Sequence, residues 1–152
     1  MTEKLQDPPA LTASTRRWQK TGVAVFLLLV LAFPIFRLTE GARLDDALAS
    51  ENRAQIAAGR QLWSLNCAMC HGTQGEGGDS PALNSQEFLK SVSDEQMHGI
   101  VAGGIPGSAM PAWLDEYGGP LTDQQIAAVV AYVRSWEETA PSVPNWRNPS
   151  GG

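Results

Sequence analysis

The chain has 152 residues and a formal net charge of −5, so it has room for one small domain and an appendage. Its charge is uneven: residues 1–38 carry five basic and two acidic side chains, whereas residues 39–152 carry six basic and fourteen acidic ones. The acidic part, near −8, argues against nucleic acid as a partner and favours a basic partner surface or simple solubility.

The first predicted element is a single transmembrane helix over residues 18–38. It contains an uncharged run of sixteen residues, Thr21–Phe36. Because about 20 residues usually cross the hydrocarbon core, flanking side chains must extend the span at the two interfaces. The flanking residues suited to this are Trp18, Lys20 and Arg37. Pro34 lies near the far end, where it can bend or end the helix.

Basic residues before this helix predict its orientation. Arg16, Arg17 and Lys20 precede the apolar run, so the positive-inside rule places residues 1–17 in the cytoplasm. The rest of the chain would then lie on the periplasmic or extracellular side of a bacterial cell membrane. A cleaved signal peptide is the alternative, since Ala47-Leu48-Ala49 has the small-x-small form. That triplet starts eleven residues past the apolar run, which is far for a cleavage site.

A polar, proline-free segment over residues 39–54 predicts a partly helical linker. The next helix is predicted over about Ala54–Asn66. It places Gly59, Trp63 and Cys67 on one face, because these residues are spaced at i, i+4 and i+8. This helix is therefore expected to deliver Cys67 directly to the group that the domain binds.

The motif Cys67-Ala68-Met69-Cys70-His71 is the attachment signature of c-type haem. Each thiol can add to one vinyl group of a porphyrin, and His71 then presents its imidazole to the iron. A zinc site would need further ligands, but the chain has only these two cysteines and one other histidine, His98. A thioredoxin-like pair should end a strand in a βαβ pattern, which the sequence lacks. The motif predicts one covalently bound haem c.

The second axial ligand has four candidates in the domain, namely Met69, Met97, His98 and Met110. Met69 lies between the two cysteines and cannot reach the opposite face. Met97 and His98 belong to a predicted short helix capped by Ser93 and point about 100° apart, so we interpret His98 as solvent-facing. Met110 follows a Gly- and Pro-rich loop that can act as a flexible strap, which favours it as the ligand. Ligation by His98 or an open sixth position stays as an alternative.

A C-terminal helix is predicted to begin after Thr122, with Gln125 completing a capping box. Its apolar positions follow the i, i+3, i+4, i+7 spacing of one helix face. These positions are Val129, Tyr132, Val133 and Trp136. A glycine at position 59 would let the two helices cross closely, with Trp63 beside Tyr132.

The segment 140–152 contains three prolines and no helical periodicity, which predicts a tail outside the domain. Trp146 is unusual in such a tail, and it either folds back on the domain or docks on a partner subunit. The predicted organisation is a cytoplasmic tail (1–17), a transmembrane helix (18–38), a linker (39–54), a haem domain (55–139) and a Pro-rich tail (140–152).

Three of these features together resemble class I cytochrome c over about residues 55–139. They are the helix with Gly59, Trp63 and the haem motif, the C-terminal helix with Tyr132, and the segment Gly107-Ser108-Ala109-Met110-Pro111. The resemblance implies an all-α fold around one haem, preceded here by the transmembrane helix. It also implies that the first and last helices of the domain cross and that His71 and Met110 ligate the iron from opposite sides.

The same resemblance implies roles around the haem for residues outside the motif. A backbone carbonyl near Pro81 should accept the Nδ1–H of His71, orienting the ring and raising its basicity. Leu83 should pack on the haem edge, and the edge near Met110 and Trp113 is the expected exit for an electron.

With both axial positions filled, the iron has no vacant site for a substrate and its potential is raised, which favours one-electron transfer. We expect a membrane-anchored monohaem cytochrome without independent catalysis, acting as a subunit of a respiratory or photosynthetic quinol-oxidising complex. Its layout resembles monohaem subunits of alternative complex III and the small subunit of nitric oxide reductase. A tethered shuttle to a terminal oxidase is the main alternative, and a peroxidase, gas-binding protein or sensor is a weaker one. The expected partners are other complex subunits, soluble or membrane redox proteins, and the lipid bilayer.

Overall fold

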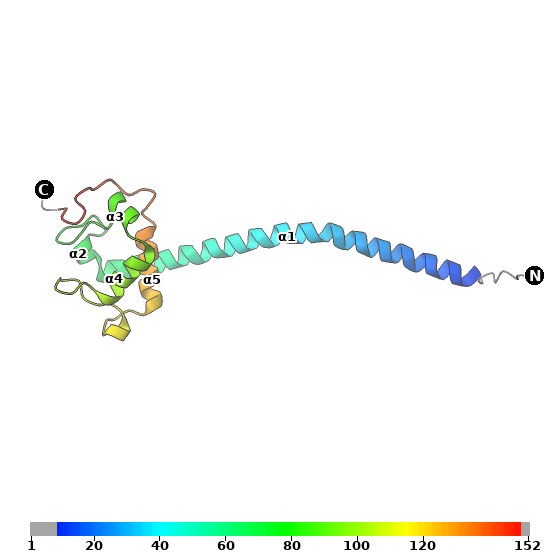
Figure 1. Cartoon of the computed structure of the whole chain (residues 1–152), viewed down its shortest axis with the longest axis horizontal. Coiled ribbons are helices and arrows are strands. Elements are labelled where there is room, and N and C mark those ends of the chain that lie inside the picture. The colour runs from blue at the N-terminus through cyan, green and yellow to red at the C-terminus, as the bar shows by residue number, and fades with distance from the viewer. Residues whose placement is uncertain (1–8, 150–152) are drawn as a thin grey trace, which may run out of the picture. The chain divides into compact units, whose positions relative to one another are not determined.

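A computed structural model describes residues 9–149, with side chains from residue 15 onward, and the chain divides into two compact units at Leu48 and Ala49. Residues 1–8, the start of the predicted cytoplasmic tail, and 150–152, the end of the predicted C-terminal tail, lie outside the described residues. The elements are α1 (Pro9–Asn66), α2 (Ala68–His71), α3 (Gln86–Ser91), α4 (Asp94–Gly103), the 3-10 helix η1 (Asp115–Tyr117) and α5 (Asp123–Arg134) (Figure 1). Within 9–149, β pairing is limited to one isolated bridge, so the predicted all-α class is confirmed.

Helix α1 is continuous from Pro9 to Asn66 and does not end at Pro34. Proline removes only one backbone donor, and the helix formers on both sides keep the remaining hydrogen bonds. The linker predicted over residues 39–54 is helical throughout rather than in part. Alanine, leucine, arginine and glutamate dominate it, which explains this outcome.

The N-terminal part of α1 is long and apolar enough to cross a membrane. Its most apolar 18-residue window has a mean hydropathy of 2.3, and none of that window is buried by the rest of the chain. The side chains of Phe26, Leu28 and Leu31 are among the many exposed ones. An exposed apolar face of this length is stable in lipid and not in water, which supports the predicted span.

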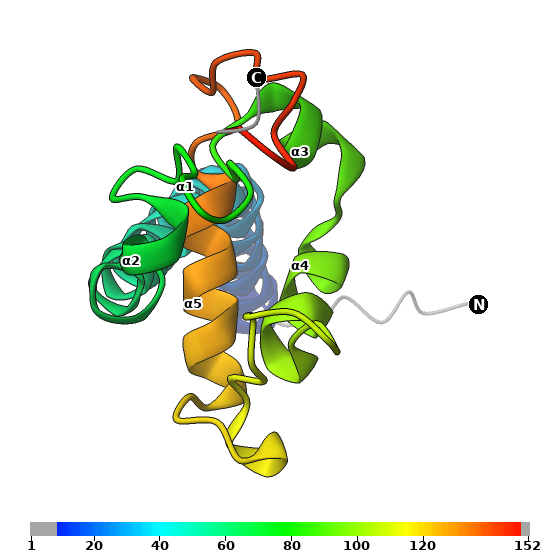
Figure 2. The ribbon, with the colours of Figure 1, turned by 90° about the vertical axis from the view of Figure 1, so that its left-hand side faces the viewer.

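The C-terminal end of α1 packs against α5, which lies across it in Figure 2. A Cβ atom added to Gly59 would collide with the backbone carbonyl of Ala128 and lie 2.9 Å from the Cβ of Tyr132. The two helices therefore approach with backbone against backbone at this point, and only glycine fits here. The predicted close crossing at Gly59 is confirmed.

Trp63 is the centre of the core beside this crossing. Its ring lies 6.2 Å from that of Tyr132, 5.1 Å from that of Trp136 and 6.0 Å from that of His71, measured between centroids. The whole predicted apolar face of the C-terminal helix is buried in the same cluster. The predicted pairing of Trp63 with Tyr132 is thus confirmed.

Capping boxes begin both α4 and α5; the predicted box at Thr122 is confirmed, and the predicted cap at Ser93 is also a full box. The Ser93 and Thr122 hydroxyls accept the amides of Gln96 and Gln125, and these glutamines bond back to the cap residues. The short helix α3 was not predicted, because it spans only six residues and its cap Ser85 lacks a partner Glu or Gln at the third position.

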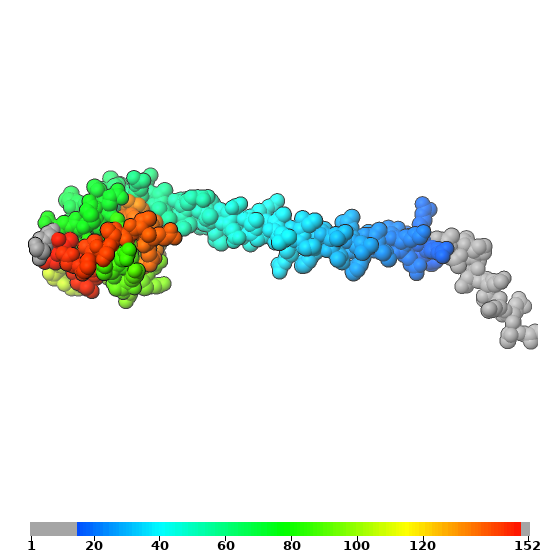
Figure 3. Space-filling view, turned by 90° about the horizontal axis from the view of Figure 1, so that it is seen from above, coloured from blue at the N-terminus to red at the C-terminus, as the bar shows by residue number. Residues whose placement is uncertain are grey.

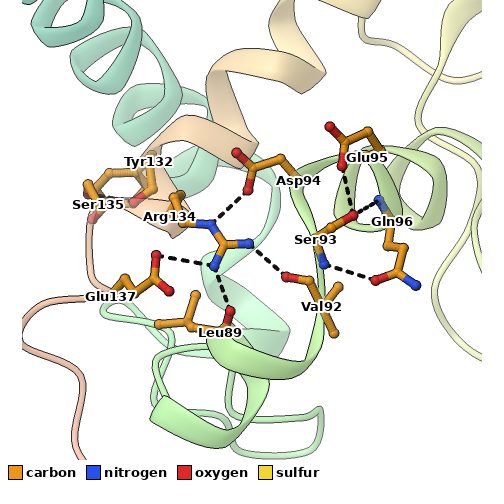
Figure 4. Close-up of polar contacts among 10 residues, drawn as sticks. All are labelled: Leu89, Val92, Ser93, Asp94, Glu95, Gln96, Tyr132, Arg134, Ser135 and Glu137. Carbon is orange, nitrogen blue, oxygen red and sulfur yellow. Dashed lines mark hydrogen bonds and ion pairs between the residues drawn. The ribbon is translucent and has the colours of Figure 1, made fainter.

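Arg134 joins the end of α5 to α3 and α4 (Figure 4). Its guanidinium donates to the carboxylate of Asp94 at 2.7 Å, and to the carbonyls of Leu89 at 2.6 Å and Val92 at 2.7 Å. It also lies 3.4 Å from the carboxylate of Glu137. The planar fork of arginine bonds two carbonyls at the end of α3 and a carboxylate of α4 at once, which a lysine could not do.

We predict that Gly59→Ala destabilises the domain by about 1–3 kcal/mol, because the added methyl group overpacks the helix crossing. Gly99→Ala is the matched control: Gly99 is also helical, but nothing lies within 4 Å of its added Cβ. That change should be neutral or stabilise by up to about 1 kcal/mol. Urea unfolding followed by tryptophan fluorescence measures both, and equal stabilities for the two variants would contradict the crossing.

Candidate haem-attachment site

The two cysteines and His71 lie at the junction of α1 and α2. The Cys67 amide donates to the Trp63 carbonyl at 2.9 Å, so the last turn of α1 carries Cys67 directly into the motif. The His71 amide then donates to the Cys67 carbonyl at 3.0 Å. Cys67 is half-buried and Cys70 is exposed.

Trp63 also holds the turn that follows His71. Its indole Nε1–H donates to the Gly72 carbonyl at 3.1 Å. Gly72 has a φ of +83°, which ends α2 in a conformation that favours glycine. The same buried tryptophan therefore supports the helix crossing and fixes the backbone next to His71.

His71 is oriented by a backbone carbonyl. Its Nδ1 lies 3.0 Å from the Pro81 oxygen. A carbonyl can only accept, so Nδ1 carries the proton and Nε2 keeps its lone pair. The Gly77 amide donates to the His71 carbonyl at 2.8 Å, which ties the loop to the same residue. An imidazole held in this tautomer is suited to binding a metal through Nε2.

Met110 lies in a closed loop between α4 and η1, rather than in the flexible strap expected from the sequence. Its carbonyl accepts the Ile105 amide at 3.0 Å, and its amide donates to the Ser108 hydroxyl at 3.1 Å. Gly104 has a φ of +68° and lies against the backbone of Met110 and Pro111, which closes the loop. A Cβ atom added to Gly104 would lie 2.8 Å from the Met110 oxygen. The Met110 side chain is half-buried. In Figures 1 and 2 this loop and α2 project on the same side of the haem domain.

Trp113 and Leu83 occupy two further predicted positions. The Trp113 backbone amide bonds to the end of α4, whereas its indole Nε1 is buried without a hydrogen-bond partner among the described residues. A buried donor left unpaired is costly unless a bound group accepts from it. Leu83 is half-buried and packs against the core cluster that contains Trp63.

His98 differs from its predicted solvent-facing position. Its side chain is 28% exposed, and its Nε2 lies 3.1 Å from the Asp123 carboxylate on α5. Its neighbour Met97 is buried. Residues in the same helix that are one position apart point about 100° apart, so Met97 faces the core while His98 reaches the first turn of α5.

Burial, and secondarily the neighbouring Cys70, raises the pKa of the Cys67 thiol to about 11. Cys67 therefore remains a neutral thiol at physiological pH. If haem is attached here, Cys67 and Cys70 would each supply the sulfur for one thioether bond to a vinyl group.

The donor set fits haem c and not an isolated metal ion. Within residues 9–149, no group of three or more His, Cys, Asp or Glu side chains is arranged to hold a metal. The haem motif instead offers two adjacent thiols and one imidazole in the correct tautomer. A further residue of the domain, Trp113, has a buried indole donor that is unpaired among the described residues. The unpaired N–H of Trp113 is suited to an acidic substituent of the bound group, such as a propionate. Together with the all-α fold, these features define a c-type cytochrome of class I.

Comparison with known proteins agrees with this class. The chain belongs to the protein family described as "Cytochrome C oxidase, cbb3-type, subunit III", which matches residues 54–133. As a member of this cytochrome c family, it binds haem c covalently.

Three relatives show how far the similarity extends. The cbb3-type cytochrome c oxidase subunit FixP of Sinorhizobium medicae (strain WSM419) is 30% identical over 67% of this chain and 37% of its own length. The cytochrome bc1 complex cytochrome c subunit of Corynebacterium diphtheriae is 31% identical over 70% of this chain and 34% of its own. Cytochrome c6 of Tetradesmus obliquus is 34% identical over 53% of this chain and 89% of its own. The chain thus spans about a third of the first two relatives.

We predict that a Cys67→Ala/Cys70→Ala double variant loses covalently bound haem, because both thioether positions are removed. Haem staining after denaturing gel electrophoresis measures this, with Met69→Ala as the control inside the same motif. The Met69 side chain is 96% exposed, so its removal should leave attachment intact. Haem retained on the denatured double variant would contradict the assignment.

Proposed function

We propose that the chain is a membrane-anchored monohaem cytochrome that transfers single electrons as a subunit of a respiratory or photosynthetic quinol-oxidising complex. The observation that carries this proposal is the fixed tautomer of His71, whose Nδ1–H is bonded to Pro81 at 3.0 Å. That bond leaves Nε2 for the iron. The bound haem supplies an iron that gains or loses one electron.

Cys67 and Cys70 attach the haem in this proposal, and His71 and Met110 are its axial ligands. With both axial positions taken, no substrate reaches the iron, and a thioether ligand raises its potential. Leu83 and Trp113 contact the ring and its substituents. Since the chain contains two cysteines and they form one motif, it binds one haem.

We extend the proposal to the membrane arrangement, which the apolar N-terminal part of α1 supports. Residues 1–17 lie in the cytoplasm, 18–38 cross the membrane, 39–54 connect, and 55–139 hold the haem on the periplasmic or extracellular side, followed by the Pro-rich tail 140–152. Basic residues before the span support this orientation, and thioether-bound haem is consistent with an exported domain. Two relatives are named as subunits of a cbb3-type oxidase and of a bc1 complex, which supports a place in a membrane complex.

We predict that Met110→Ala opens the sixth position of the iron. Loss of the thioether should lower the midpoint potential and allow carbon monoxide to bind the ferrous haem, because the sixth ligand is removed. Optical spectra of the reduced protein with and without carbon monoxide measure the change, and Met69→Ala should resemble the parent. Carbon monoxide binding to the parent as readily as to Met110→Ala would refute the electron-transfer assignment.

A fixed subunit and a tethered shuttle differ in their response to salt. The acidic domain should meet a basic partner, and the Debye length falls from ~10 Å at 0.1 M salt to ~3 Å at 1 M. A shuttle that must encounter its partner slows continuously over this range, whereas a bound subunit keeps its rate until the complex dissociates. We expect the second result in stopped-flow reduction of native membranes. A steep continuous decline would instead indicate a shuttle to a terminal oxidase.

A further inference from the structure

We infer that residues 140–149 of the C-terminal tail are a positioning element for the His71 imidazole, acting through the single peptide unit between Pro81 and Ala82. The inference rests on the proposed role of His71 as an axial ligand. In Figure 3 the tail, coloured orange to red, lies on the surface of the haem domain beside the green segments that include α3. Trp146 therefore folds back on its own domain.

The peptide unit between Pro81 and Ala82 is bonded at both ends. Its carbonyl faces His71 Nδ1 at 3.0 Å, and its N–H donates to the Trp146 carbonyl at 2.7 Å. A peptide unit is planar, so any rotation of this plane changes both hydrogen bonds together. A peptide whose N–H donates also has a more polarised carbonyl, which makes it a better acceptor. The Trp146 carbonyl of the tail is thus bonded directly to the peptide unit whose carbonyl accepts from His71.

The tail shields this peptide unit from water. Ala82 has no exposed surface, so its N–H depends on the Trp146 carbonyl as acceptor. Pro149 covers the preceding turn, since a Cβ added to Gly77 would lie 2.7 Å from the proline Cγ. Gly77 is itself bonded to the His71 carbonyl. If the tail left, water would reach the loop and compete for the Pro81 carbonyl.

Several contacts between α3 and the tail hold it in place. The Glu87 carboxylate accepts the Ser142 hydroxyl at 2.6 Å and the Val143 amide at 2.7 Å. Gln86 donates its amide to the Pro141 carbonyl at 3.0 Å and its side chain to the Ala140 carbonyl at 3.1 Å. These contacts fix the tail residues closest to the domain.

Aromatic packing holds the next part of the tail. Trp146 packs edge-on against Phe88, with 5.1 Å between ring centroids, and the Arg147 guanidinium lies over the Trp146 ring, 4.1 Å from its centroid. Phe88 belongs to the core cluster that contains Trp63. The position of the Trp146 carbonyl is therefore set by both the core and α3.

The Glu87 contact is present at neutral pH. The hydrogen bonds from Ser142 and then from the Val143 amide lower the pKa of Glu87 from its ordinary 4.5 to about 2. A carboxylate with a lowered pKa stabilises the folded state above pH 4.5, and this contribution is lost as the pH falls towards 2. The tail is accordingly held throughout the physiological range.

The expected consequence is a shift in redox potential. A strong acceptor on Nδ1–H makes the imidazole more basic, which favours the ferric iron and lowers the potential. Release of the tail should weaken that hydrogen bond and raise the midpoint potential. A role limited to stability would leave the potential of the folded protein unchanged.

Glu87→Gln tests this against a closely matched control, Glu95→Gln. Both glutamates lie two residues after a helix-capping serine, and both accept that serine's hydroxyl. Only Glu87 also binds the tail, so both changes remove the same charge but only one weakens the attachment of residues 140–149. We expect a higher midpoint potential and faster hydrogen exchange at Ala82 in Glu87→Gln, and parent-like values in Glu95→Gln. An equal shift in the two variants would overturn the inference.

A second pair of variants and a truncation complete the experiment. Trp146→Ala should raise the midpoint potential. Trp146→Phe keeps a ring against Phe88 and should have the midpoint potential of the parent. A chain that ends at Ala140 keeps this buried residue and removes the rest of the tail. A parent-like potential in this folded, haem-loaded chain would refute the inference. The parent is measured first: absence of covalent haem there would refute the proposed function, whereas a normal haem with a tail-independent potential refutes only the role of the tail.

Discussion

The haem domain depends on the contact between Gly59 and the backbone of Ala128, where α1 and α5 cross. Without a Cβ at Gly59, the helices approach closely enough for Trp63 to pack against both Tyr132 and Trp136. The indole N–H of Trp63 then bonds to the Gly72 carbonyl. A contact between two helix backbones thus sets the position of the turn after the haem motif.

Two backbone segments that are separate in the sequence hold His71, one at the end of α1 and the other at Pro81. On one side the last turn of α1 and Trp63 fix its main chain, and on the other the Pro81 carbonyl fixes its ring. The peptide that supplies this carbonyl is in turn bonded to Trp146. Axial geometry in this protein is therefore a property of the core, the loop and the tail together, and it is expected to respond to changes in any of them.

Local patterns were predicted well from the sequence because their causes are local. The cap at Ser93, the capping box at Thr122 and the apolar face of the C-terminal helix involve residues within one or two helical turns, and the structure contains the caps and buries all four apolar residues. The predicted helix was too long, since α5 ends at Arg134 and Trp136 lies in the turn that follows. The short helix α3, the closed loop around Met110 and the Arg134 bonds were missed. The Arg134 bonds depend on partners distant in sequence, since 45 residues separate Arg134 from Leu89. Helix α3 has only six residues, and the Met110 loop is closed by contacts such as Ile105 with Met110 that no periodic pattern predicts.

The sequence by itself determined the chemistry: two thiols and an imidazole in five residues, an apolar run at the N-terminus, and a glycine one turn before Trp63. Spacing along one helix is enough to place these groups, since helix geometry is regular. Only the tertiary structure decided that the tail folds back, that His98 pairs with Asp123, and that the Pro81–Ala82 peptide links Trp146 to His71. Those contacts join segments separated by long stretches of chain, and only the packing of the core brings them together.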